Sequence, residues 1–216
     1  MSDLQRVVIK AGGSLLSSEG GIERLVAWLR SEEATGLAPV RVLVVGGGAI
    51  ADGVRKIDQA NPLSDEAAHW AAIRALEINT HLVAEQLTGF LQTDQLQSIR
   101  SCNEQRDFLL QPMRFLLDEE PSLPGAPLTI GWDVTSDSIA ARVAACLGSS
   151  LVLIKSAPGC VASSWPDASA AGLVDRAFPR YAEEVDSIRV LYLPGHPDGG
   201  AGGDRPGKAK ILPTKR

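Results

Sequence analysis

The sequence has few cysteines, and they form no pattern. Three occur in 216 residues, Cys102, Cys146 and Cys160, at wide spacing and without a Cys-x-x-Cys pair. This odd, scattered set excludes a disulfide-stapled miniprotein and provides no zinc or redox motif. Cysteines used in this way are typical of a reducing compartment, so we expect a cytoplasmic protein.

Long apolar runs and clusters of positive charge are also missing. No stretch of about 18 apolar residues occurs, and Lys10 interrupts the first apolar segment, so we expect neither a membrane span nor a signal peptide. Lys and Arg number 21 against 26 Asp and Glu, a net charge of −5, without a dense basic run. Because phosphate neutralisation needs a clustered positive face, we expect no nucleic-acid partner.

The residues that are present predict an α/β fold. Hydrophobic residues make up 44% of the chain, enough for a proper core, and the length predicts a single domain over 1–216. Short, β-branched, apolar runs at 6–9, 40–45 and 151–154 are typical of buried parallel strands. A helix expected over 21–30 joins the first two strands into a βαβ unit.

The remaining segments predict further helices and strands. Helices are expected over 64–91, 139–147 and 178–185, and strands over 128–132 and 188–193. Ser64 is the expected cap of the first of these helices. Pro158 and Gly159 fit the centre of a type II turn. The stretch 93–123 fits either a helix or a pair of strands, with a strand slightly favoured at 114–117.

Two glycine loops follow the first two predicted strands. Backbone amides at the carboxyl end of a parallel sheet can turn toward an anion, and phosphate is the obvious one. Neither loop has the spacing of a dinucleotide-binding loop or a P-loop. They could be tight turns alone, but Lys10, two residues before Gly12, favours an anion site.

Other polar residues allow more than one interpretation. Asp137 lies in a polar loop before a predicted helix, where it or Ser136 could simply cap that helix. The three histidines lack zinc-ligand spacing, so no metal site is expected. His69 precedes Trp70 near the start of the long helix, and a tryptophan there is more often a core or interface residue than a substrate stacker.

Three motifs, in this order, resemble the amino-acid kinase superfamily. They are the segments KAGGS (10–14), VVGGG (44–48) and TSDSIAA (135–141). The segment LIKSAPGCV (153–161) is similar to the strand and turn that contact the nucleotide there. The resemblance covers most of the chain and implies a three-layer α/β/α sandwich with a central, mostly parallel sheet. It also implies an acceptor-binding half at about 1–125 and a nucleotide-binding half at about 126–216.

The resemblance implies residue roles as well as a fold. Catalytic roles are implied for Lys10, Asp137 and Lys155. Nucleotide or phosphate binding is implied for Gly12, Gly13, Ser14, Ser136, Lys208 and Lys210. Acceptor binding is implied for Gly46, Gly47, Gly48 and His69. Asp137 would orient Lys10 and a second, nucleotide-side lysine, for which Lys155, Lys208 and Lys210 are all candidates. The amides of Gly12, Gly13, Gly46 and Gly47 would contact the phosphates and the acceptor.

The implied activity is a small-molecule kinase that uses ATP and Mg²⁺ and phosphorylates a phosphate or carboxylate oxygen. The short chain looks most like kinases of one-carbon cofactor synthesis, in which an aminomethylfuran-methyl phosphate is the acceptor. Uridylate or an acidic amino acid is the alternative acceptor. A nucleotide-binding or storage protein of the same fold, without kinase turnover, is the alternative function. Trp70 and Ile78 widen the apolar face of the long helix, which predicts a homodimer.

Overall fold

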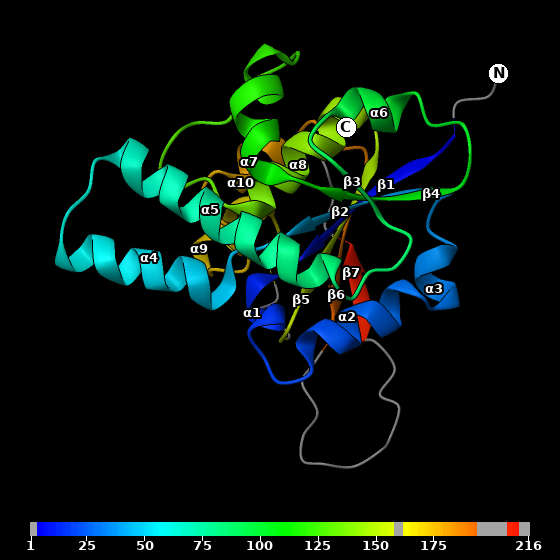
Figure 1. The fold of residues 1–216 in the computed structure, drawn as a ribbon, viewed down its shortest axis with the longest axis horizontal. Coiled ribbons are helices and arrows are strands. Elements are labelled where there is room, and N and C mark those ends of the chain that lie inside the picture. Colours follow the sequence, from blue (N-terminus) through cyan, green and yellow to red (C-terminus); the bar gives the residue numbers. More distant parts are fainter. Residues whose placement is uncertain (1–3, 158–161, 194–206, 212–216) are drawn as a thin grey trace.

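The computed structural model describes residues 4–157 and 162–193 in full, and residues 207–211 by their backbone (Figure 1). The strands are β1 (Arg6–Ala11), β2 (Val40–Val45), β3 (Leu91–Thr93), β4 (Arg106–Leu110), β5 (Ser150–Lys155), β6 (Ile188–Tyr192) and β7 (Gly207–Ile211). In the described part of the chain they form a seven-stranded sheet in the order β3-β4-β2-β1-β5-β6-β7. Neighbouring strands from β3 to β6 run parallel, and β7 is antiparallel to β6.

Helices cover both faces of this sheet. They are α1 (Gly13–Leu16), α2 (Gly21–Leu29), α3 (Glu32–Thr35), α4 (Gly48–Ala60), α5 (Asp65–Ala84), α6 (Leu96–Arg100), α7 (Pro112–Arg114), α8 (Ser136–Leu147), α9 (Trp165–Ala170) and α10 (Phe178–Ala182), with a π-helical turn η1 (Phe115–Glu119) and a 3-10 turn η2 (Glu120–Ser122). Helices α2 and α3 lie on one face, and α6, α8 and α10 on the other (Figure 1). Helix α4 runs alongside α5 at one side of the sheet.

The core consists of two apolar clusters, one on each face. Side chains alternate along a strand, so Val8 of β1 packs in the cluster with α8, whereas Val7 and Ile9 pack in the cluster with α2. All six residues of β2 are buried, because this strand has neighbours on both edges and helices on both faces. The result is a rigid sheet whose carboxyl edge carries the loops.

The structure confirms the predicted α/β fold, with a mostly parallel sheet between two helical layers. The strands expected over 6–9, 40–45 and 151–154 are β1, β2 and β5, and the helices expected over 21–30 and 139–147 are α2 and α8. Within the residues that the structure describes, no helix has the length and hydropathy needed to span a membrane.

The prediction of a strand over 128–132 is wrong. The segment approaches α8 without joining the sheet, and its amides bond to side chains instead. The amide of Leu128 donates to Glu120 Oε1 (3.1 Å), and that of Thr129 donates to the Tyr181 hydroxyl (3.3 Å). Strands β1, β2 and β5 are already paired on both edges, so no inner position remains for another strand.

Two further expectations need correction. The segment 114–117, for which a strand was favoured, is helical. Phe115 and Leu116 are both buried while Leu117 is 48% exposed, and two consecutive buried residues fit one face of a helix better than an alternating strand. The long helix starts as predicted, with Ser64 Oγ accepting from the Ala67 amide (3.2 Å), but it ends at Ala84 rather than near residue 91.

The remaining predicted elements fall close to their expected places. The helix and strand expected over 178–185 and 188–193 are α10 and β6, each ending earlier than expected. The predicted turn at Pro158 and Gly159 lies outside the described residues. The division into an acceptor half and a nucleotide half concerns function and stays a prediction.

Candidate active site

Two lysines lie at the carboxyl ends of neighbouring strands. Lys10 is in β1, two residues after Val8, and Lys155 is in β5, two residues after Leu153. Val8 and Leu153 both pack in the cluster with α8. Because side chains alternate along a strand, both lysines project from the same face of the sheet. The parallel register places Lys10 beside Leu153, so the two ammonium groups converge on the first turn of α8.

Asp137, in that first turn, binds both lysines. Its Oδ1 lies 2.9 Å from Lys10 Nζ and 2.9 Å from Lys155 Nζ, and its Oδ2 lies 3.0 Å from Lys155 Nζ. Asp137 and Lys10 are buried, with 8% and 5% of their side chains exposed, and Lys155 is mostly covered, with 13% exposed. The structure therefore brings together the three residues expected to be catalytic.

The electrostatics of this cluster favour an anion. Burial alone would raise the pKa of Asp137, but the charges and hydrogen bonds of Lys10 and Lys155 outweigh it and lower that pKa to about 2. Burial lowers the pKa of Lys10, because a carboxylate shared with a second ammonium group compensates only part of the desolvation. Two ammonium groups and one carboxylate leave a net charge of +1 in a buried place.

Asp175 caps α8, and Asp137 does not. Asp175 Oδ2 accepts hydrogen bonds from the amides of Thr135 (2.9 Å) and Ser138 (3.0 Å) and from the Thr135 hydroxyl (2.8 Å). Asp175 Oδ1 accepts from the amide of Phe178 (2.9 Å), which begins α10. One carboxylate thus fixes the starts of two helices, and the interpretation of Asp137 as a simple cap does not fit the structure.

The two glycine loops touch each other at their backbones. Gly13 opens α1 and Gly48 opens α4, and a Cβ atom on Gly13 would collide with the amide nitrogen of Gly48. Gly48 also has a φ of +50°, in the left-handed region that favours glycine. Only glycine allows this close approach, which places the first turns of both helices side by side.

The amides of these loops are not equivalent. Gly12 donates its N–H to Ile154 O (2.9 Å) and Gly46 to Ala11 O (3.0 Å), so the expectation that these two amides contact phosphates or the acceptor is wrong. They extend the hydrogen bonding of the sheet instead. Among the described glycines of these two loops, Gly13, Gly47 and Gly48 donate their amides to no carbonyl of the protein.

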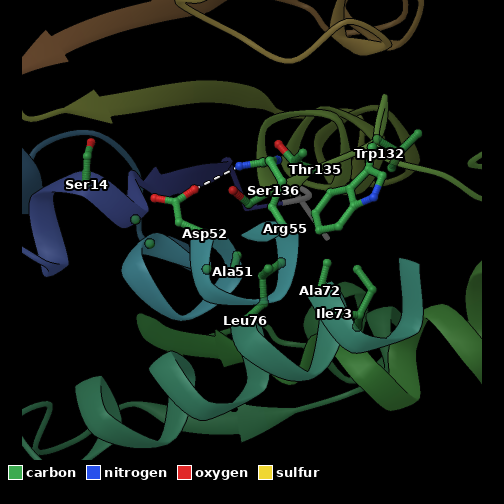
Figure 2. Close-up of a pocket in the computed structure, with 14 residues that line it drawn as sticks. Ser14, Ala51, Asp52, Arg55, Ala72, Ile73, Leu76, Trp132, Thr135 and Ser136 are labelled. Carbon is green, nitrogen blue, oxygen red and sulfur yellow. Dashed lines mark hydrogen bonds and ion pairs between the residues drawn. The ribbon is translucent and has the colours of Figure 1, made fainter. Parts of the chain in front are cut away.

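A pocket of about 240 Å³ opens beside the glycine loops. It lies between α1, the start of α4, the middle of α5 and the loop before α8, and Figure 2 shows the side chains that line it. Ser14 and Ser136, both expected to bind phosphate, are among them. Ser14 Oγ also lies 3.0 Å from Ser156 Oγ, which connects the first glycine loop to the segment after β5.

His69, expected to bind the acceptor, lies behind the pocket and does not line it. Its side chain is buried, and its Nδ1 is 3.3 Å from both the amide nitrogen and the carbonyl oxygen of Gly131. Its ring meets that of Trp70 edge to face at 5.1 Å between centroids. Burial lowers the pKa of His69, so the ring is neutral at neutral pH. The side chain supports the loop at Gly131 rather than offering a ligand.

The sequence also matches a known family over most of its length. The model of the amino acid kinase family matches residues 5–187, a range that contains Lys10, Lys155, Asp137 and both glycine loops. The chain belongs to the amino acid kinase family. No curated protein matches the sequence significantly.

Solved structures of amino acid kinase fold support the architecture. Uridylate kinase from Archaeoglobus fulgidus is 18% identical with a TM-score of 0.57, covering 88% of this chain and 91% of that one. UMP kinase from Bacillus anthracis is 14% identical with a TM-score of 0.52, covering 89% and 88%. Aspartate kinase from Synechocystis is 14% identical with a TM-score of 0.60, covering 97% of this chain but 40% of that one. At these identities the likeness concerns the fold.

For this amino acid kinase family member, the sequence left three candidates for the second lysine. The structure places Lys155 at Asp137. Lys208 and Lys210 belong by their backbone to β7, and their side chains lie outside the described residues. Lys155 is therefore the candidate with a structural position at the centre of the site.

Sequence reasoning missed the charged side of the pocket. Helix α4 was not predicted, and it carries Asp52, Arg55 and Asp58 at steps of three along one face. Arg55 Nη1 donates to Asp52 Oδ1 (2.8 Å), and Trp132 Nε1 donates to Asp58 Oδ2 (2.7 Å). The absence of proline between the second glycine loop and residue 61, together with this spacing, would have indicated the helix.

Proposed function

We propose that this protein is an ATP-dependent kinase that transfers the γ-phosphoryl group to a phosphate or carboxylate oxygen of a small molecule. The observation that supports it most is the Asp137 carboxylate shared between Lys10 and Lys155, in front of two glycine loops. Membership of the amino acid kinase family supports the same activity.

The site suits phosphoryl transfer because that reaction needs positioning and charge stabilisation rather than covalent help. Asp137 holds the two ammonium groups in fixed places before any ligand binds, so no reorganisation is needed when charge develops on the transferring oxygens. The surplus positive charge of the cluster matches an anionic ligand. Lys10, at the mouth of the first loop, would contact the transferring group, and Lys155 the nucleotide side.

The free amides of the glycine loops would donate hydrogen bonds to oxygen atoms of the substrates. The unpartnered amides of Gly13, Gly47 and Gly48 lie at the starts of α1 and α4, where the positive ends of helix dipoles add to their attraction for an anion. The pocket on the α4 side of these amides would hold the acceptor, and it is lined by α1, α4 and α5 and by residues 132–136 of the loop before α8.

The residues fit Mg²⁺ that is bound through the phosphates of ATP. Both oxygens of Asp137 already hold ammonium groups. Among the described residues, no group of three or more His, Cys, Asp or Glu side chains is arranged to hold a metal ion. Mg²⁺ often binds through substrate phosphates and water with little help from protein side chains, so this donor set suits it. When bound, it would neutralise part of the charge on the transferring oxygens.

For the acceptor, we propose an aminomethylfuran-methyl phosphate in one-carbon cofactor synthesis, on the basis of the motifs of the chain. Uridylate and an acidic amino acid are the alternatives that the assay must include. A cytoplasmic location stays a prediction from cysteine use.

A homodimer is also proposed, through the outer face of α5. Ile78 and Leu82, one turn apart on this helix, are 48% and 52% exposed, so the helix retains apolar surface that the monomer leaves uncovered. Sedimentation should show a dimer at micromolar concentration, and Ile78→Glu should shift it to monomer. A wild-type protein that sediments as a monomer would contradict the dimer.

The experiment that tests the proposed function is acceptor-dependent release of ADP from Mg-ATP over a panel of phosphate monoesters and carboxylates. The expected result is a strong increase with at least one acceptor and its loss in Lys10→Ala. ATP binding without turnover on any member of a broad panel would favour the alternative, a nucleotide-binding or storage protein of the same fold.

A further inference from the structure

The outer part of the pocket is a slot with one aromatic wall. Figure 2 shows the indole of Trp132 on one side and Ala72 and Ile73 of α5 on the other. Ala51 of α4 also lines the pocket. The side chains that face the indole from α5 are small or apolar, and the charged lining residues, Asp52 and Arg55, come from α4.

Trp132 is held in this place from two directions. Its Nε1 donates to Asp58 Oδ2 (2.7 Å), and Asp58 is itself anchored by the amide of Leu63 (2.9 Å from Oδ1). The guanidinium carbon of Arg55 lies 4.7 Å from the centroid of the indole. His69 supports the preceding residue, Gly131, from behind. The indole plane is therefore set by the protein and does not have to be ordered by a ligand.

Arg55 is free to change partners at the mouth of the slot. Its ion pair with Asp52 is exposed, with 42% of the Arg55 side chain and 63% of the Asp52 side chain accessible. Exposed pairs of this kind contribute little stability. Arg55 can thus leave Asp52 and turn its donors toward a polar group of a bound molecule.

The size of the pocket limits what fits. Its volume of about 240 Å³ is below the roughly 300–1,000 Å³ of pockets that enclose drug-sized ligands. The glycine loops and Ser136 occupy one end, so the reacting group of an acceptor uses part of this space. What remains suits a single ring better than a ribose and a base.

We propose that Trp132 and Arg55 determine acceptor specificity, and that they select a compact phosphate monoester with a flat, unsaturated ring over a nucleoside monophosphate. This inference rests on the proposed function in placing the acceptor here. The ring stacks on the indole, the phosphate points to the loop amides, and Arg55 contacts a polar substituent at the mouth.

The test compares three probes by calorimetry on the full chain: benzyl phosphate, cyclohexylmethyl phosphate and UMP. The first two differ in the flatness of a ring of the same size. Wild-type protein should bind benzyl phosphate roughly five- to tenfold more tightly than cyclohexylmethyl phosphate, the order of gain that stacking on an aromatic ring supplies beyond buried area. UMP should bind more weakly than benzyl phosphate.

Variants of Trp132 and Arg55 test whether these residues cause the preference for a flat ring. Trp132→Leu should remove the difference between the two ring phosphates, and Trp132→Phe should restore part of it because a flat ring returns. Arg55→Met tests the second residue while the indole stays in place, and it should weaken the binding of 4-carboxybenzyl phosphate more than that of benzyl phosphate. Ile130→Ala is the matched control on the same loop, since Ile130 is 53% exposed and does not line the pocket, and it should bind all probes as wild type does.

The outcomes separate this inference from the proposed function. Equal binding of the two ring phosphates by wild-type protein, tighter binding of UMP, or an unchanged preference in Trp132→Leu would each overturn it. Binding is measured without ATP, so a protein that lacks turnover but shows the ring preference overturns the kinase assignment and leaves the specificity of the pocket standing.

Discussion

Replacing Asp137 by Asn tests the central feature of the site, because it removes one negative charge and almost no volume. The parent cluster has two ammonium groups around one buried carboxylate. In Asp137→Asn the amide oxygen can still accept a hydrogen bond from one lysine, but both positive charges lose their counter-charge. The net charge of the cluster rises from +1 to +2.

The losses of stability and of turnover can both be estimated from the structure. Removing one partner of a buried ion pair costs about 3–5 kcal/mol, because the other charge is left uncompensated. For a chain of this length each kcal/mol corresponds to roughly 2–4 °C, so the melting temperature should fall by roughly 6–20 °C. Turnover should fall by about 100-fold or more, as expected when a preorganised electrostatic arrangement is lost.

Thermal melting and acceptor-dependent ADP release measure the two effects on the same preparation. Asp133→Asn is the matched control, because Asp133 is 64% exposed and its contact with Arg176 is long (3.6 Å), and it should leave both quantities unchanged. The double variant Asp137→Asn/Lys155→Met returns the cluster to +1 and should recover stability but not turnover. Asp137→Asn with parental stability and turnover would refute the reasoning.

Other changes probe the neighbouring parts of the site. Lys10→Ala should lower turnover by at least about 100-fold while changing ATP affinity far less, as measured by steady-state kinetics and calorimetry. Asp175→Ala leaves the start of α8 uncapped and should cost about 1–2 kcal/mol in urea unfolding and lower turnover through Asp137, whereas Asp175→Asn should restore part of both. Burial lowers the pKa of Lys10 below its usual 10.5, so the folded protein loses this proton, and with it activity, at a pH where the unfolded chain still holds the proton. Because the unfolded state then binds more protons, the free energy of unfolding should rise with pH up to about 10.5, and Lys10→Met should abolish that rise. The pKa of Asp137 is about 2, so its stabilising contribution should be complete above about pH 4 and disappear toward pH 2, as followed by acid unfolding.

The inner part of the fold could be predicted from the sequence because its signals are strong and local. Buried parallel strands appear as continuous apolar runs, and β1, β2 and β5 were found for that reason. The segment at 128–132 has the same local signal. It stays outside the sheet because neighbouring strands already fill the inner positions, which a local pattern does not contain.

The candidate site shows the same limit. The resemblance implied roles for Lys10, Asp137 and Lys155, but it left Lys208 and Lys210 as further candidates for the second lysine. Strand alternation alone does not show that Lys10 and Lys155 share a face, because that depends on which strands are neighbours and on their register. Asp175 was missed because one of the two helices that it caps, α8, begins almost 40 residues before it in the chain. Arg55 and Trp132 meet through the packing of α4 against the loop before α8, and no local motif marks that contact.

The most direct test of the account follows the γ-phosphoryl group itself. ATP labelled with ³³P at the γ position is incubated with the full chain, Mg²⁺ and each acceptor of the panel, and the products are separated. We expect the label to move to one compact acceptor. The Asp133→Asn variant should transfer it as fast as wild type, and the Asp137→Asn variant about 100-fold more slowly. Label that stays on ATP with every acceptor, or that Asp137→Asn transfers as fast as wild type, would contradict this expectation.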